Sequence, residues 1–303
     1  MFHREAVPEY GILLIIDVQN DFCEGGSIAR KGGRKIVPII NDLMKQDRIH
    51  LVVATQDWHP KNHISFASSH MDGERVGTEP LQGEIAPFKR ALVRSPNTVS
   101  YAPGTGKVDK MLWPDHCVAG SIGSGFYYQQ SGDLWLDYKN IDLIYRKGTD
   151  SELDAYDVLW DEIGRPSALH FLFESMIRNM DNDLAFYIVG IATDGCVAYT
   201  ADRLVQLISS VKEQHEPKVC MERGCFGDPK ASLDKKVTVK VVSNACVGTS
   251  EEEHQNALER LKTTSIEVVE HIIPFPHNCG RAAELRKDGL TEAEITYIIE
   301  EGK

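Results

Sequence analysis

Short apolar runs rich in β-branched residues alternate along the chain with longer amphipathic stretches. Nearly continuous apolar runs of this length are typical of strands in a parallel sheet, because helices cover both faces of such a sheet. The pattern therefore predicts a three-layer α/β/α fold, in which a six-stranded, mostly parallel sheet lies between two layers of helices. The predicted strands are residues 11–17, 51–57, 141–147, 185–192, 237–245 and 265–271.

The amphipathic stretches predict helices between these strands. In residues 34–46 the apolar side chains recur every three or four positions, which places them on one helix face. Two further segments open with the Ser/Thr-x-x-Glu pattern of a helix N-terminus, in which both side chains accept backbone N–H groups. The predicted helices are residues 34–46, 167–180, 196–211 and the segments that begin at Ser250 and Thr291.

Three connections are longer than is usual between neighbouring elements, namely residues 64–112, 149–184 and 212–236. In a compact domain such loops are more often lids or insertions than linkers. No change of composition along the chain marks a second domain. We therefore expect a single domain over residues 1–303, whose insertions could cover the site, build the interface of a homo-oligomer or alter the substrate range.

Charge and composition disfavour several classes of protein. Lys and Arg total 33 against 45 Asp and Glu, a formal net charge of −12, and no run of Lys or Arg stands out. This disfavours a surface for nucleic acid or for an anionic membrane. No apolar stretch approaches the ~20 residues that span a bilayer, and the first residues lack the apolar segment of a signal peptide. Seven irregularly spaced cysteines fit free thiols, so we expect a cytoplasmic protein.

Polar residues with chemical potential follow four of the predicted strands. Asp17, Asp57 and Lys147 each end a strand, and Cys196 comes just after another, at the start of a predicted helix. Any one of them alone is more often a solvated turn residue, a helix cap or a small buried thiol. Because the carboxyl ends of parallel strands lie along one edge of the sheet, where such proteins bind ligands, their joint occurrence predicts a site there.

Cys196 has the setting of a nucleophile. Free backbone N–H groups at a helix N-terminus favour the thiolate, and a nearby lysine favours it further. Asp17, on a neighbouring strand, can take the thiol proton and return it to a leaving group. Asp17, Lys147 and Cys196 together predict an acyl-transfer triad, in which no histidine is needed as the base.

Histidines near the same edge predict a metal site. Asp57 and His59 project to the same side of an extended strand end, because they lie two residues apart. His116, in "WPDHCV", adds a second imidazole, and one oxygen with two nitrogens suits a divalent ion such as Zn²⁺, while Fe²⁺ and Mn²⁺ accept the same ligands. On these residues alone, both histidines could instead be ordinary loop residues. His63 is either a further ligand or a partner of the ligands.

Five segments resemble, in the same order, the motifs of the nicotinamidases, which belong to the isochorismatase-like hydrolases. Five ordered motifs are far more specific than one short pattern. The resemblance implies the Rossmann-like three-layer fold of that superfamily. The segments are "LLIIDVQNDFCEGGSI" (13–28), "TQDWHPKNHISF" (55–66), "WPDHCVAGSIGSGF" (113–126), "RKGTDSELDAY" (146–156) and "GIATDGCV" (190–197).

The resemblance implies a role for each candidate residue. Cys196 matches the family nucleophile, Asp17 its general base and acid, and Lys147 the residue that holds this pair in register. The positions that match the family's metal ligands are Asp57, His59 and His116.

The resemblance also implies the reaction, which is hydrolysis of nicotinamide to nicotinate and ammonia in NAD salvage, with the metal on the ring nitrogen. Phe22 and Tyr156 match aromatic positions that flank the ring, although either could be an ordinary core residue. Ala192 and Cys196 match the backbone N–H donors to the oxyanion. They lie beside a cis peptide bond that in this chain would join Ile191 to Ala192.

One departure from the motifs is Gly195, which stands where many relatives carry Tyr. Two other functions stay open. The chain could be another amidase of the superfamily, whose members outside the nicotinamidases lack the complete metal set. It could also be a metal-binding or partner-binding protein on this fold without turnover. A protein that loses its activity usually keeps the fold and loses the site residues, so the presence of Asp17, Lys147 and Cys196 argues against this alternative.

Overall fold

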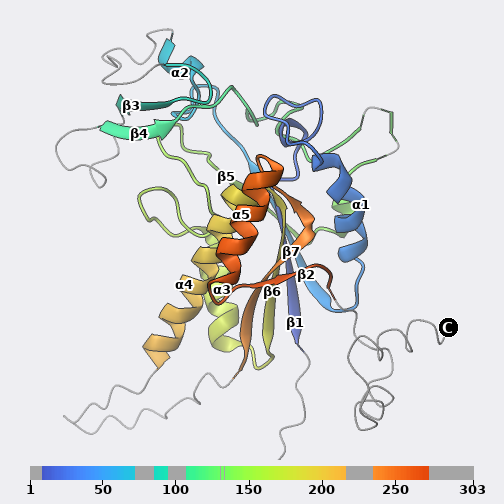
Figure 1. Ribbon diagram of the computed structural model, residues 1–303. Helices are drawn as coiled ribbons and strands as arrows, with labels where there is room; N and C mark the ends of the chain where they lie inside the picture. The colour runs from blue at the N-terminus through green and yellow to red at the C-terminus, as the bar shows by residue number, and fades with distance from the viewer. Residues whose placement is uncertain are drawn as a thin grey trace, which may run out of the picture.

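The computed structural model describes residues 9–71, 85–94, 107–129, 131–132, 134–215 and 235–272. Within them, all six predicted strands form one sheet in which every neighbouring pair is parallel (Figure 1). The strands are β1 (Tyr10–Ile16), β2 (Ile49–Asp57), β5 (Leu143–Lys147), β6 (Leu184–Ile191), β7 (Val237–Val247) and β8 (Glu267–Val269). Their order across the sheet is β5-β2-β1-β6-β7-β8.

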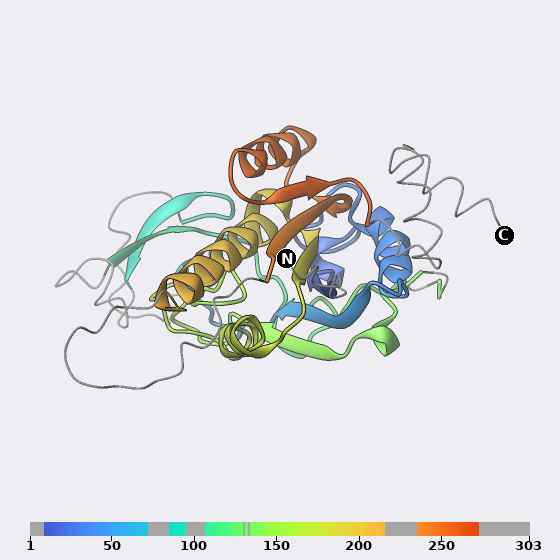
Figure 2. The same cartoon turned by 90° about the horizontal axis from the view of Figure 1, so that it is seen from below.

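Helices cover both faces of this sheet, which confirms the predicted three-layer α/β/α fold. They are α1 (Gly33–Leu43), α3 (Ala168–Asn179), α4 (Ala198–His215) and α5 (Glu251–Lys262). Helix α1 lies on one face, and the other three lie on the opposite face (Figures 1 and 2). The Ser250 side chain accepts the backbone N–H of Glu253 at 3.1 Å, as the capping pattern predicts. Among the described residues no helix is long and apolar enough to cross a membrane.

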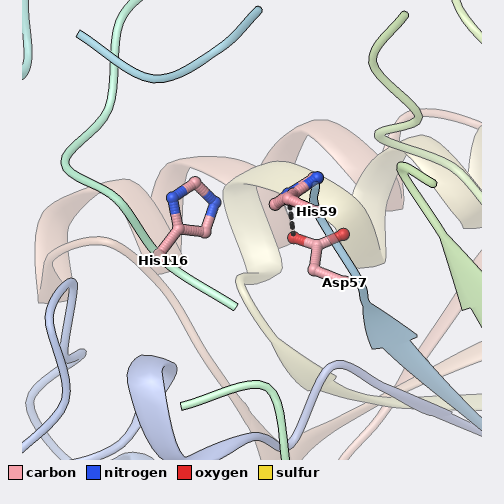
Figure 3. A group of neighbouring side chains, drawn as sticks. All are labelled: Asp57, His59 and His116. Carbon is pink, nitrogen blue, oxygen red and sulfur yellow. Dashed lines mark ion pairs between the residues drawn. The ribbon is translucent and has the colours of Figure 1, made fainter. Parts of the chain in front are cut away.

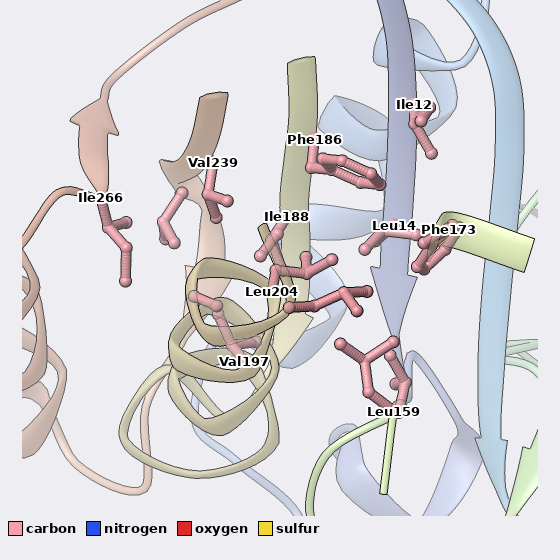
Figure 4. Packing of buried hydrophobic residues seen from close by; sticks show 14 of the residues in the cluster. Ile12, Leu14, Leu159, Phe173, Phe186, Ile188, Val197, Leu204, Val239 and Ile266 are labelled. Carbon is pink, nitrogen blue, oxygen red and sulfur yellow. The ribbon is translucent and has the colours of Figure 1, made fainter. Parts of the chain in front are cut away.

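The two faces of the sheet have separate hydrophobic cores, because alternate residues of a strand point to opposite sides. On one side, Leu14 of β1 belongs to a cluster with Phe173 of α3 and Leu204 of α4 (Figure 4). On the other side, Leu13 belongs to a cluster with Ile40 of α1. All five side chains are fully buried. The near-continuous apolar character of β1 thus follows from its central place in the sheet.

The long connection over residues 64–112 contains structure of its own. It includes the short helix α2 (Ser68–Met71) and an antiparallel hairpin of β3 (Arg90–Arg94) and β4 (Lys107–Met111). Figure 1 shows this hairpin beyond the end of the main sheet at which the strands finish. The connection over residues 149–184 contains α3, close to the helix predicted over residues 167–180. Most of residues 212–236, and the helix expected at Thr291, lie outside the described residues.

The carboxyl ends of β1, β2, β5 and β6 are neighbours, since these four strands are adjacent in the sheet. After β1 the chain passes to α1 on one face, and after β6 it passes to α4 on the other. A crevice between two strands whose connections diverge in this way is the usual ligand site of an open α/β sheet. Asp57 and Lys147 are direct partners in the β2–β5 pairing, so the topology brings the polar strand ends together.

Candidate active site

Asp17, Lys147 and Cys196 meet at this edge of the sheet. Nζ of Lys147 lies 2.9 Å from Oδ2 of Asp17 and 3.5 Å from Sγ of Cys196. Burial and the nearby carboxylate of Asp17 both raise the pKa of the Cys196 thiol. Lys147 and Asp17 are at most 2% exposed, and Cys196 is half-buried. The structure thus places the ammonium of Lys147 in contact with both the Cys196 thiol and the Asp17 carboxylate.

Two buried polar residues that were not predicted from the sequence hold Asp17 and Asp57 in place. Oγ1 of Thr55 donates to Oδ1 of Asp17 at 2.6 Å and accepts the backbone N–H of Asp17 at 3.1 Å. Gln19 accepts the backbone N–H of Asp57 and donates to its carbonyl, both at 2.8 Å. Thr55 lies two residues before Asp57 on one strand face, so the period of a strand offered a signal for it. Nothing local in the sequence indicates the partner of Gln19.

The buried ionisable groups of the site differ in the direction of their pKa shifts. Burial by itself would lower the pKa of Lys147, but the carboxylates of Asp17 and Asp57 outweigh it and raise that pKa well above its ordinary value. Burial would raise the pKa of Asp57, yet Lys147 and His59 lower it. For Asp17 burial prevails, and its pKa is raised in spite of Lys147. Asp17 is therefore the carboxylate of the pair better suited to accept a proton.

Cys196 lies in a one-turn π-helix, Thr193–Val197, that leads from β6 into α4. The preceding peptide bond, between Ile191 and Ala192, is cis, as the resemblance implied. Burial opposes the effect expected from this setting. Burial raises the pKa of the Cys196 thiol well above its ordinary value, and the opposing charge of Lys147 does not reverse this. The thiol is protonated at rest and needs a base.

Asp57, His59 and His116 form a second cluster beside the triad (Figure 3). Their ligand atoms all lie within 4.8 Å of one another, and Nε2 of His59 is 3.5 Å from Oδ2 of Asp57. Backbone pairing brings His116 to this place, because the backbone of His59 donates to the carbonyl of Cys117 at 3.0 Å and accepts from Ala119 at 2.8 Å. All three side chains of the cluster are at most 6% exposed.

The hydrogen bonds of the two histidines leave Nε2 of each ring available. Nδ1 of His59 contacts the carbonyl of Gly148 at 3.0 Å, and Nδ1 of His116 contacts that of Pro114 at 2.8 Å. Because a carbonyl only accepts, each Nδ1 carries the proton, which is the usual arrangement of a metal-binding histidine. A side chain on Gly148 (φ 63°) would lie 2.4 Å from the ring of His59, so only glycine fits. These residues fit a divalent metal ion.

His63 does not join this ligand group. Its Nδ1 lies 2.7 Å from Oγ of Ser65, and its Nε2 lies 3.1 Å from the carbonyl of Leu153, so both ring nitrogens are engaged. The ring packs against that of His59, with 4.1 Å between centroids. Burial and the neighbouring His59 lower the pKa of His63 to about 3, so this histidine is neutral. Of the two alternatives left open by the sequence, the structure favours a partner that supports the ligands.

A cavity opens onto both clusters. Its wall includes Phe22, Tyr156 and Ala192, the three residues expected to contact substrate. Trp113 and Arg30 also line it, although the sequence analysis did not single them out. A mostly apolar cavity on which a few polar groups converge is typical of a small-molecule site.

Comparisons with known proteins agree with this geometry, although no family model matches the chain. The chain is 37% identical over 191 residues to the nicotinamidase of Acinetobacter baylyi, an alignment of 62% of this chain and 72% of that protein. It is 33% identical over 198 residues to the nicotinamidase of Escherichia coli, covering 64% and 76%. The yeast nicotinamidase bound to the inhibitor nicotinaldehyde has a similar structure, with a TM-score of 0.60 and 26% identity over 86% of this chain and 100% of that one.

The three-layer fold is shared with the yeast nicotinamidase and, with this site, is that of an α/β/α hydrolase. Within this class, the chain belongs to the nicotinamidase family of amide hydrolases.

Proposed function

We propose that this protein hydrolyses nicotinamide to nicotinate and ammonia. The observation that carries the proposal is the contact of Lys147 with both the Cys196 thiol and the Asp17 carboxylate, at a cavity that is also lined by three side chains able to hold a metal ion. The names of the relatives support this substrate, as does the nicotinaldehyde complex of the yeast enzyme. Nicotinate would then be available to pyridine nucleotide salvage.

The first half of the reaction is an attack by Cys196. Because the thiol is protonated at rest, Asp17 takes its proton as Sγ attacks the amide carbon. Lys147 stays charged beside both groups and stabilises the negative charge wherever it resides. Backbone N–H groups of Ala192 and Cys196 are the proposed donors to the carbonyl oxygen as it becomes an oxyanion.

The second half releases the product. Asp17 gives its proton to the amide nitrogen, the C–N bond breaks, and ammonia leaves while the acyl group stays on Sγ as a thioester. Asp17 then accepts a proton from water, whose oxygen attacks the thioester carbon. The C–S bond breaks, the thiol regains the proton, and the acid ionises to nicotinate.

Asp57, His59 and His116 are the proposed ligands of a divalent ion, for which Zn²⁺ is our first choice and Fe²⁺ or Mn²⁺ alternatives. When bound, the ion supplies a Lewis acid for the nitrogen of the pyridine ring. Phe22 and Tyr156 are the proposed walls on either side of that ring.

We also propose that the protein acts in the cytoplasm as a single catalytic domain. The four described cysteines, Cys23, Cys117, Cys196 and Cys246, are all free thiols, which supports a reducing compartment.

The experiment is an assay of ammonia release from nicotinamide, with and without a chelator, alongside other primary amides. We expect turnover of nicotinamide that the chelator abolishes and the added ion restores. Turnover of another amide in preference to nicotinamide would point to a different amidase of the class. No turnover of any amide by metal-loaded protein would contradict an enzymatic function.

A further inference from the structure

Arg30 brings a positive charge into the wall of the cavity. Its backbone N–H donates to the carbonyl of Phe22 at 2.9 Å, which fixes the loop between β1 and α1. Its half-buried side chain lines the same cavity as Cys196 and His116. The guanidinium lies over the ring of Trp113, with 5.9 Å from Cζ to the ring centroid. Stacking of this kind holds the planar group while leaving its N–H donors free.

The Arg30 side chain has no acidic partner among the residues that the structure describes. Its Nε is buried without a hydrogen bond, and no described residue forms an ion pair with it. Burial lowers the pKa of the Arg30 guanidinium, and the nearby acid Asp194 opposes this shift without reversing it, but Asp194 is engaged elsewhere. Its two carboxylate oxygens accept from the backbone and the hydroxyl of Thr249, at 2.7 and 2.5 Å. A partly buried guanidinium without a partner is an incomplete ion pair, which an anionic ligand can complete.

The other charges of the cavity wall are already compensated. Lys147 lies 2.5 Å from Asp57, and Asp154 lies 3.6 Å from Lys110. Arg30 is therefore the cation of the described wall that is left to meet a negative charge on a ligand. The proposed reaction creates such a charge, because a neutral carboxamide becomes a carboxylate at the same carbon.

We infer that Arg30 is a specificity-determining residue that binds the carboxylate of the product. The contact raises the affinity of the site for a pyridine carboxylate above the affinity that contacts to the ring alone provide. This inference rests on the proposed function. It implies that nicotinate inhibits the enzyme by competing with nicotinamide. It also implies that the affinity for the neutral amide depends little on Arg30.

The test compares Arg30→Met with Arg30→Lys in the full-length, metal-loaded protein. A charge-assisted contact at a partly exposed site corresponds to about tenfold in affinity. We expect Arg30→Met to raise the inhibition constant of nicotinate about tenfold and to change KM for nicotinamide less than about twofold. Arg30→Lys should keep most of the nicotinate affinity, which shows that the charge matters more than the shape. Arg34→Met, which removes an exposed cation four residues away on α1, is the matched control and should change neither constant.

Two results would overturn the inference. One is an inhibition constant of nicotinate that is the same in Arg30→Met as in the wild type. The other is an equal rise of the nicotinate constant and of KM, which would make Arg30 only a part of the pocket wall. Calorimetric titration of wild type and Arg30→Met with nicotinate gives the same comparison without turnover. The inference about Arg30 can therefore be judged even if nicotinamide is not hydrolysed.

Discussion

Nζ of Lys147 lies 2.5 Å from Oδ1 of Asp57, so a single buried ammonium joins the proposed metal-binding carboxylate to the proposed catalytic triad. The same ammonium lies 2.9 Å from Asp17. The charge of Lys147 therefore compensates two carboxylates, one in each part of the site. A change at Lys147 should affect catalysis, metal binding and stability together.

Replacement of Lys147 with Met should destabilise the protein by about 3 to 5 kcal/mol at neutral pH, because it leaves two buried carboxylates without a cation. In the wild type the pKa of Asp57 is lowered, so its ionisation stabilises the fold and this contribution is lost as the pH falls. In the variant both buried carboxylates resist ionisation and their pKa values rise. Their contribution to stability is then lost as the pH rises, which is the opposite of the pH dependence in the wild type. The deficit should thus be larger at about pH 7 than at about pH 5. Urea unfolding of metal-free wild type and variant at both pH values measures it, and a deficit that does not shrink in acid would contradict this charge balance.

Replacement of His116 with Ala should abolish stoichiometric binding of the divalent ion, since it removes one of three ligands whose atoms lie within 4.8 Å. The added ion should raise the melting temperature of the wild type and not of the variant, because binding to the folded state stabilises it. His271→Ala, at an exposed position, is the control. Elemental analysis that finds the full metal content in the His116 variant would rule out this ligand set.

Lys110 should be important for the hairpin of β3 and β4 as well as for the site. Its side chain is 2% exposed and lies 2.5 Å from Glu162 and 3.6 Å from Asp154, which lines the cavity. Lys110→Met leaves two acids without their cation and should cost about 3 to 5 kcal/mol. Arg90→Met removes an ion pair of the same hairpin whose side chains are 58% exposed, and should cost less than about 1 kcal/mol. If chemical unfolding showed the same loss in free energy of unfolding for both variants, the burial of Lys110 would not contribute to stability.

The described cysteines should differ in reactivity toward an alkylating reagent. Burial raises the pKa of Cys23 and of Cys246 to about 12, and that of Cys117 well above its ordinary value, and all three side chains are buried. Cys196 also has a raised pKa but is half-buried at the cavity wall. Among these four, Cys196 should be modified first, and nicotinate should protect it. Peptide mapping by mass spectrometry measures the order, and earlier modification of Cys246 in folded protein would contradict the difference in burial between these thiols.

The sequence sufficed to predict the sheet and the meeting of Asp17, Asp57, Lys147 and Cys196. Parallel strands finish at one edge whatever their order, so residues at strand ends become neighbours by topology alone. The nearly continuous apolar run of β1 fits its place between the two cores, because its side chains enter one or the other of them.

The contacts that depend on tertiary structure were beyond the sequence. The ion pair of Lys110 with Glu162 joins a hairpin to a distant loop, and the place of Arg30 in the cavity depends on how its loop folds back over Phe22. The raised pKa of the Cys196 thiol was beyond the sequence for a related reason. The helix terminus and Lys147 are visible in the sequence, but the burial that outweighs them becomes apparent only in the folded protein.

The most direct test of a cysteine mechanism is ammonia release from nicotinamide by wild type and Cys196→Ala at matched metal content. If Sγ attacks the amide carbon, the variant should keep its metal and its affinity for nicotinate while its turnover falls by at least about a thousandfold. Turnover close to that of the wild type in the metal-loaded variant would instead mean that water attacks the amide without a thioester, and the role of Cys196 as the nucleophile would be wrong.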